Sequence, residues 1–160
     1  MNKIIWVIVA LVILGLGYAV LNNRSNQEPV SAKTTVASKV VVTEGSYDFG
    51  TIDIFGGKVE TDFTLTNEGT EDIAILAGTT SCGCTDGSID GIGFGMHEQM
   101  SGPAIIKAGE SKNVTAIYDP LAHGPEGTGA VTRQLFLKTN SKTTPEIELR
   151  ISANVVKNQL

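Results

Sequence analysis

The chain has 160 residues and a formal net charge of −5, and it contains two cysteines and two histidines. Residues 40–160 carry eight basic and sixteen acidic side chains, a net charge of −8, which argues against binding to nucleic acid or to an anionic membrane surface. A segment of about 120 residues buries one ordinary core without help from a metal or a disulfide. The cysteines are therefore not needed to hold the fold.

Residues 4–21 form an uncharged apolar run, IIWVIVALVILGLGYAVL. As a helix rising about 1.5 Å per residue, this run spans most of the ~30 Å hydrocarbon core of a bilayer. The pattern Gly17-Tyr18-Ala19 also fits the cleavage site of a signal peptide. Because the apolar run continues to Leu21, residues 1–21 are predicted to be a transmembrane signal-anchor. Both alternatives place the following domain outside the cytoplasm, in the periplasm or at the cell surface, and a cleaved chain would be secreted.

Residues 22–39 are polar and small, contain Pro29, and show no apolar period of either helix or strand. Such a composition is typical of a flexible linker. We expect this segment to tether the following domain to the membrane.

From residue 40 onward, apolar residues recur with a period of two, which indicates strands with one buried face. The runs that show this alternation are 39–42, 59–66, 72–76, 113–118, 131–137 and 147–151. Turn-forming residues separate them at Asn67-Glu68-Gly69, Ala108-Gly109-Glu110 and Asn140-Ser141. The pattern predicts an all-β chain with one immunoglobulin-like antiparallel sandwich of about seven strands over residues 40–160, preceded by one N-terminal transmembrane helix.

Several motifs occur in a fixed order along this region. They are Tyr47-Asp48-Phe49-Gly50-Thr51-Ile52, Phe63-x-Leu65-Thr66-Asn67-Glu68-Gly69, Ser81-Cys82-Gly83-Cys84-Thr85, Lys107-Ala108-Gly109-Glu110-Ser111, Tyr118-Asp119-Pro120 and Lys138-Thr139-Asn140-Ser141. As an ordered set, residues 40–156 resemble the bacterial domain-of-unknown-function family fifteen-seventy-three, a relative of the ASH, MSP and Hydin type of Ig-like domains. The resemblance implies a seven-stranded sandwich, exported or membrane-anchored, with no established catalytic activity, and it implies no ligand.

The soft metal-ligand side chains after the start methionine are confined to one stretch. They are Cys82, Cys84, Met96, His97, Met100 and His123. Thiolate, thioether and imidazole are the donors that suit copper(I) and zinc. Two cysteines separated by one residue project to the same face of a strand, and Gly83 leaves the backbone free to bend. The pattern predicts that these six side chains bind copper(I), ahead of zinc.

Residues 86–103 contain five glycines and form a longer connection than the resemblance implies. We expect a structureless, functional or mobile loop, in which glycine allows close approach to a bound species. Asp86-x-Ser88-x-Asp90-Gly91 also resembles the first half of an EF-hand calcium loop. The twelfth position of that loop is His97, however, and no helices are predicted beside it.

The same side chains also fit roles without a metal. Cys82 and Cys84 could form a local disulfide in an oxidising compartment, and such a small ring is expected to be more reducible than a structural bridge. This raises thiol–disulfide exchange as an alternative function, although the spacing is not Cys-x-x-Cys. Both cysteines could instead be reduced and partly buried as small hydrophobic side chains. The methionines could cover the end of the core, and the histidines could be solvated loop residues.

We expect a non-enzyme, because nothing in the sequence places a serine, a histidine and an aspartate together. The sequence favours a membrane-anchored, extracytoplasmic Ig-like module of the cell envelope that binds copper(I) or zinc. The alternative is an interaction module without a metal, which uses its sheet edges or its long loop to dock another envelope protein. No nucleic acid is expected as a partner.

Overall fold

The computed structural model describes residues 35–158, which form strands, turns and loops. Ten strands follow one another in chain order: β1 (Val40–Val42), β2 (Ser46–Asp53), β3 (Val59–Asn67), β4 (Ile73–Thr80), β5 (Thr85–Ile89), β6 (Ile92–Gly95), β7 (Ala104–Ile106), β8 (Ser111–Tyr118), β9 (Gly129–Thr139) and β10 (Glu146–Val156). This part of the chain holds no apolar helix of membrane-spanning length. Residues 1–21, where the sequence predicts the anchor, lie outside the described residues.

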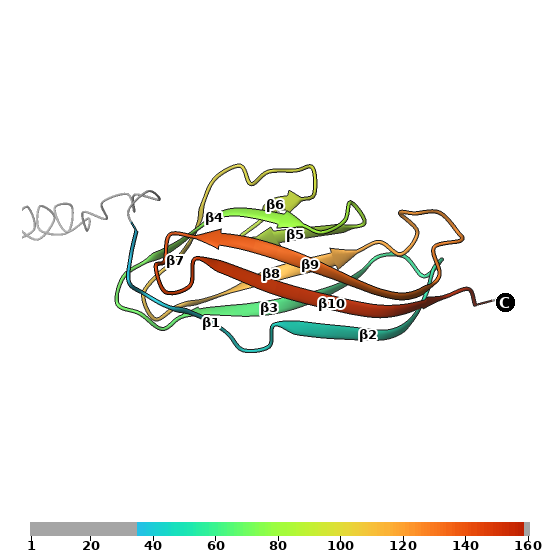
Figure 1. Ribbon diagram of the computed structural model, residues 1–160, viewed down its shortest axis with the longest axis horizontal. Helices are drawn as coiled ribbons and strands as arrows, with labels where there is room; N and C mark the ends of the chain where they lie inside the picture. Colours follow the sequence, from blue (N-terminus) through green and yellow to red (C-terminus); the bar gives the residue numbers. More distant parts are fainter. Residues whose placement is uncertain (1–34, 159–160) are drawn as a thin grey trace, which may run out of the picture. The chain divides into compact units, whose positions relative to one another are not determined.

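The ten strands form two five-stranded sheets (Figure 1). Sheet one has the order β1-β3-β8-β5-β6, and sheet two has the order β2-β10-β9-β4-β7. The predicted all-β, sandwich-like fold is confirmed, with two corrections among the described residues. There are ten strands rather than about seven, and the sandwich is not purely antiparallel because β2 pairs parallel with β10.

The core follows directly from the alternating pattern. Along β10, Ile147, Leu149, Ile151, Ala153 and Val155 are buried while the residues that alternate with them are more exposed. Each fully buried aliphatic side chain stabilises the fold by about 1.5–3 kcal/mol relative to an exposed one. The same alternation in β9 extends this face of sheet two, and that in β3 and β8 supplies the opposing face from sheet one.

The six strands predicted from the period of two are all confirmed, and they correspond to β1, β3, β4, β8, β9 and β10. The other four strands lack a clear alternation. β2 lies at the edge of sheet two and is exposed along most of its length, while β7 has three residues. A largely exposed strand and a strand of three residues are both too weakly patterned for a period of two to be recognised.

The prediction of a structureless loop over residues 86–103 is wrong for its first half. β5 and β6 form a hairpin whose turn residues, Asp90 and Gly91, have φ values of 53° and 76°. Positive φ at both positions is typical of the two-residue type I′ turn, for which Asp-Gly is a preferred sequence. The residues that resemble half of a calcium loop therefore form two paired strands and their turn.

The hairpin is anchored by Phe94, whose side chain has 0% exposure. Its ring lies against Gly87 of the paired strand β5 and against Gly78 of β4 in the other sheet. A Cβ atom added at these glycines would lie 2.3 Å and 2.6 Å from the ring. The close approach that glycine permits here is thus to an aromatic ring in the core.

The last residues of the predicted linker lie on the domain. Val36 is buried, forms a parallel bridge with Ser141, and donates its backbone N–H to the carbonyl oxygen of Asn140 at 3.0 Å. The Ser141 hydroxyl donates to the carbonyl oxygen of Ser38. The structure therefore differs from the predicted tether over residues 36–39, which pack with the sandwich.

Candidate functional site

Residues 81–84 form the turn that connects β4 of sheet two to β5 of sheet one. The Thr85 N–H donates to the carbonyl oxygen of Cys82 at 3.1 Å. The buried Thr80 hydroxyl lies 3.0 Å and 2.8 Å from the carbonyl oxygens of Cys82 and Thr85. The cysteines thus lie on a turn and its end, not on the extended strand that the sequence suggested. The turn still brings the two side chains together.

The sulfurs of Cys82 and Cys84 form a disulfide. Cys84 is 2% exposed, whereas Cys82 is half-buried and accepts the Cys84 N–H at 3.3 Å. A Cβ atom at Gly83 would meet nothing within 4 Å, and its φ lies outside the left-handed region. The turn therefore does not require glycine at this position, and the side of the turn that Gly83 faces is open.

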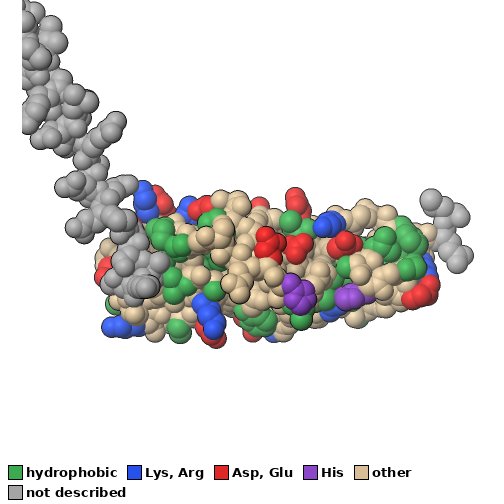
Figure 2. Space-filling model, turned by 90° about the horizontal axis from the view of Figure 1, so that it is seen from above, with side chains coloured by type: hydrophobic (Ala, Val, Ile, Leu, Met, Phe, Trp, Pro, Cys, Tyr) green, Lys and Arg blue, Asp and Glu red, His purple; other side chains and the backbone are tan. Residues whose placement is uncertain are grey.

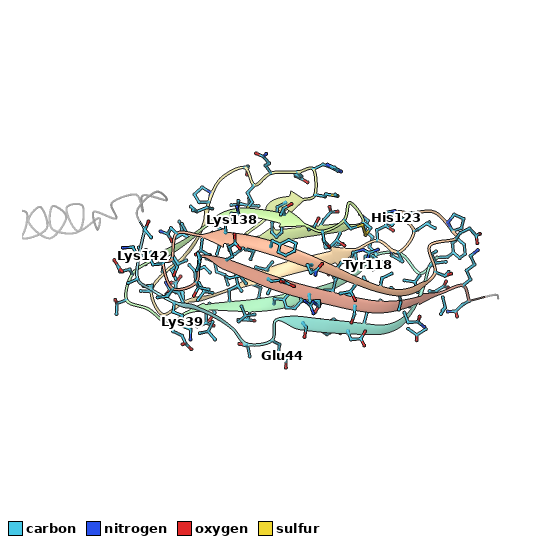
Figure 3. All side chains as sticks on the ribbon, viewed as in Figure 1. Lys39, Glu44, Tyr118, His123, Lys138 and Lys142 are labelled. Carbon is cyan, nitrogen blue, oxygen red and sulfur yellow. A yellow bond between two sulfur atoms is a disulfide. The ribbon has the colours of Figure 1, made fainter. Side chains whose placement is uncertain are left out.

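His123 reaches the disulfide from the loop after β8. Thr85 pairs with Tyr118 at the end of β8, and the Asp119 N–H donates to the Cys84 carbonyl oxygen at 2.9 Å. This pairing starts the loop beside the cysteine turn. The His123 Nε2 atom then lies 3.1 Å from the Cys82 Sγ atom, and Figure 3 shows the labelled His123 beside the yellow sulfur atoms.

Arg133 reaches the other sulfur from β9. Its Nε donates to the Cys84 Sγ atom at 3.1 Å, and its Nη1 donates to the Thr132 carbonyl oxygen at 2.8 Å. Arg133 lies on the same face of β9 as the buried Leu135 and Leu137, and its side chain is half-buried. No ion pair among residues 35–158 includes Arg133. We refer to Cys82, Cys84, His123 and Arg133 as the sulfur site.

Tyr118 forms an adjoining wall and is 2% exposed. Burial raises the pKa of its phenol above the ordinary value of 10.0, the Arg133 charge lowers this pKa, and the Asp119 carboxylate raises it. Burial has the largest effect, so the phenol stays neutral at physiological pH. The cationic Arg133 therefore has no tyrosinate as a counter-ion.

The structure brings together three of the six predicted ligands. The ligand atoms of Cys82, Cys84 and His123 all lie within 4.8 Å of one another, and His97 is outside this group. Met96 is 50% exposed, and Met100 packs against the core at the rim. Ligation by His97, Met96 and Met100 stays a prediction. Figure 2 shows the histidine side chains, in purple, on one face of the domain.

Arg133 was not among the residues predicted from the sequence. The sequence nevertheless contains a sign that Arg133 is unusual. In the alternating run 131–137, Arg133 occupies an inward position between Val131 and Leu135. A charge at such a position costs free energy unless a partner compensates it. That conflict with the pattern marks Arg133 as a candidate functional residue.

Residues 40–155 match the sequence profile of a family described as protein of unknown function, DUF1573. No curated protein matches the chain. The match covers both cysteines, His123 and Arg133, so the whole sulfur site lies within the family region.

Among solved structures, a protein of unknown function from Porphyromonas gingivalis W83 is similar, with a TM-score of 0.56 and 17% identity. The alignment covers 81% of this chain and 51% of that protein, so the chain spans about half of its length. The ASH/PapD-like domain 7 of human CEP192 is also similar, with a TM-score of 0.50, 14% identity, and coverage of 86% and 99%. At these identities the likeness concerns the fold.

Proposed function

The chain belongs to the DUF1573 family of proteins of unknown function, and we propose that its domain is an extracytoplasmic, membrane-tethered module that binds copper(I) at the sulfur site when the disulfide is reduced. The observation that carries this proposal is the group of three ligand atoms, from Cys82, Cys84 and His123, within 4.8 Å of one another. Two loops of the sandwich supply these ligands.

The three ligand atoms can converge on a single ion after a small movement. With metal–ligand bonds of about 2.0–2.3 Å, two ligands on opposite sides of an ion lie at most about 4.6 Å apart, slightly less than the 4.8 Å within which the three atoms lie. Reduction of the Cys82–Cys84 bond frees both sulfurs, and a small adjustment of the turn and of the His123 side chain then completes the site. The Thr80 hydroxyl and the Thr85 N–H, which bond to carbonyl oxygens of the turn, hold the turn in place during this change.

The charge around the sulfurs favours copper(I) over zinc. Copper(I) held by two thiolates carries a net charge of −1, whereas zinc held by the same pair is neutral. The guanidinium of Arg133, 3.1 Å from the Cys84 sulfur, compensates the copper(I) complex. Structural zinc sites also use four protein ligands, and the sulfur site offers three.

Export and tethering are part of the proposal and rest on the apolar run at residues 4–21. A disulfide between Cys82 and Cys84 suits an oxidising compartment outside the cytoplasm. We propose a carrier or sensor that delivers its ion to another envelope protein, and no catalytic step.

The test is a copper(I) competition titration of the full chain, reduced and in detergent solution, against a chromophoric copper(I) chelator. We expect one copper(I) per chain, taken from the chelator. The Cys82→Ser/Cys84→Ser variant is expected to take none. Gly83→Ala is the matched control in the same turn, since its added methyl group meets nothing within 4 Å.

Equal copper(I) uptake by the double variant and the unmodified chain would refute the site. A stoichiometric gain for zinc but not for copper(I) would refute the choice of metal. The melting temperature of each apo variant is measured alongside, because the proposal requires the domain to remain folded without the sulfurs.

A further inference from the structure

We propose that the Cys82–Cys84 disulfide exchanges with dithiols, with Cys82 as the sulfur that is attacked and Cys84 as the sulfur that leaves toward Arg133. This activity goes beyond copper(I) binding and does not depend on it. Three features of the described residues support it: unequal access to the two sulfurs, a separate partner for each sulfur, and an inward arginine without a carboxylate.

Access distinguishes the two sulfurs. Cys84 is 2% exposed, whereas Cys82 is half-buried and follows the exposed Ser81. The open space at Gly83 leaves the turn uncovered on one side. An incoming thiolate therefore reaches Cys82 and not Cys84, and exchange rates depend on which sulfur is accessible.

Arg133 contacts the less accessible sulfur, that of Cys84, which is the proposed leaving sulfur. Arg133 donates to the sulfur of Cys84 at 3.1 Å, and a disulfide sulfur is a weak acceptor. When Cys84 becomes a thiolate, the same contact becomes a charge-assisted hydrogen bond. The reduced state thus gains a counter-ion for a charge that has no ion-pair partner within residues 35–158. A stabilised reduced state makes the disulfide more oxidising.

His123 serves the exposed sulfur. Its Nε2 lies 3.1 Å from the Cys82 Sγ atom, so the imidazole is placed to hydrogen-bond the Cys82 sulfur when the disulfide opens. The two sulfurs therefore have different partners: an exposed histidine at the attacked sulfur, and an inward arginine at the leaving sulfur.

The chemistry balances as a two-electron exchange. A thiolate of the dithiol attacks Cys82, a bond forms between the two sulfurs, and the Cys82–Cys84 bond breaks with its electron pair remaining on Cys84. The second thiolate of the dithiol then attacks its own first sulfur, and the electron pair of the mixed disulfide remains on Cys82. The dithiol is oxidised to a disulfide, and the chain is reduced. The two protons of the dithiol pass to the cysteines, or to solvent where a cysteine stays a thiolate.

The first test uses the full chain in detergent with a copper(I) chelator present, so that a failure of copper(I) binding leaves the result unaffected. Cys84→Ser, which keeps Cys82, and Cys82→Ser, which keeps Cys84, are each reacted with glutathione disulfide. Mass spectrometry follows the mixed disulfide. We expect the Cys82 thiol to react at least about tenfold faster than the Cys84 thiol. Equal rates, or a faster Cys84, would overturn the assignment.

The second test measures the reduction potential of the intact pair in dithiothreitol buffers. We expect Arg133→Gln to lower the equilibrium constant for reduction about tenfold, which is about 30 mV toward a more negative potential. Arg133→Lys keeps the charge and should restore part of this shift, which distinguishes a charge effect from a packing effect. A potential that is unchanged or more positive in Arg133→Gln, with an unchanged melting temperature in both variants, would refute the role of Arg133.

Discussion

Two neighbouring stretches of the chain contain five of the six predicted soft ligands, and these stretches have different roles in the structure. The cysteine turn, residues 81–84, meets His123 across 41 positions of sequence. The hairpin and the loop after it, residues 85–103, follow the cysteines directly, yet they contribute no ligand to the group of three. Sheet register explains the difference. Thr85 pairs with Tyr118, which starts the His123 loop beside Cys84.

Both stretches contain glycine, but the glycines differ in what constrains them. Gly87 makes room for the Phe94 ring, and Gly91 forms the hairpin turn, so these glycines serve the fold. Gly83 has neither constraint and lies between two sulfurs that contact a histidine and an arginine. The short turn therefore carries the two sulfurs of the proposed site, and the glycines of the long segment shape the hairpin.

The sharpest test of this division is Phe94→Ala. Removal of a fully buried phenylalanine is expected to cost about 3–5 kcal/mol of unfolding free energy, measured by urea denaturation. Gly87→Ala, which places a methyl group 2.3 Å from the ring, should cost about 1–3 kcal/mol by overpacking. Copper(I) affinity of the folded fraction should stay within about twofold. A large loss of affinity would show that the hairpin belongs to the site.

The second-largest expected effect is the loss of copper(I) affinity when a proposed ligand is removed. We expect His123→Ala to weaken copper(I) binding by at least about tenfold, since changes to groups that only support metal ligands already cost 10–100-fold. His97→Ala is the matched control, because His97 is also exposed but lies outside the group of three. The chelator titration compares both variants with the unmodified chain. A larger loss of copper(I) affinity in His97→Ala than in His123→Ala would contradict the group of three and favour the ligand set predicted from the sequence.

Much of the fold could be predicted from the sequence, because apolar residues that recur with a period of two directly indicate a strand with one buried face. The six runs with this pattern all became strands. β2 and β7 escaped detection because they lie at sheet edges, where burial does not enforce alternation. β5 and β6 were hidden by their glycines, of which Gly87 makes room for the Phe94 ring.

Only part of the sulfur site could be predicted from the sequence. Residue chemistry identified Cys82, Cys84 and His123, but the sequence could not show which ligands meet, because that depends on the register between β5 and β8. Arg133 lies on β9, the neighbour of β4 in sheet two, so its contact with Cys84 depends on the register between β4 and β9. The Asp90-Gly91 pair carried a hairpin signal that the partial match to a calcium loop obscured.

A smaller effect compares the glycines of the two stretches. Gly91 has a φ of 76°, so Gly91→Ala should cost about 1 kcal/mol, because a side chain disfavours the left-handed conformation. Gly83→Ala has open space and no positive φ, and its unfolding free energy should change by less than about 0.5 kcal/mol. Urea denaturation of both variants measures the contrast. A greater loss at Gly83 would mean that the cysteine turn carries backbone strain.

The smallest effect concerns Tyr118, the buried wall of the sulfur site. Because burial raises the pKa of its phenol above 10.0 in the folded state, the unfolded chain loses this proton first as pH rises. Stability from this group is therefore fully present below pH 10 and is lost as the pH rises through the raised pKa. In Tyr118→Phe, the fall of unfolding free energy between about pH 9 and pH 11 should be less steep than in the unmodified chain. The slope against pH, measured by urea denaturation, reports this difference. An identical slope in the two proteins would mean that the Tyr118 phenol ionises equally easily in the folded and unfolded states, and that Arg133 offsets the effect of burial at the sulfur site.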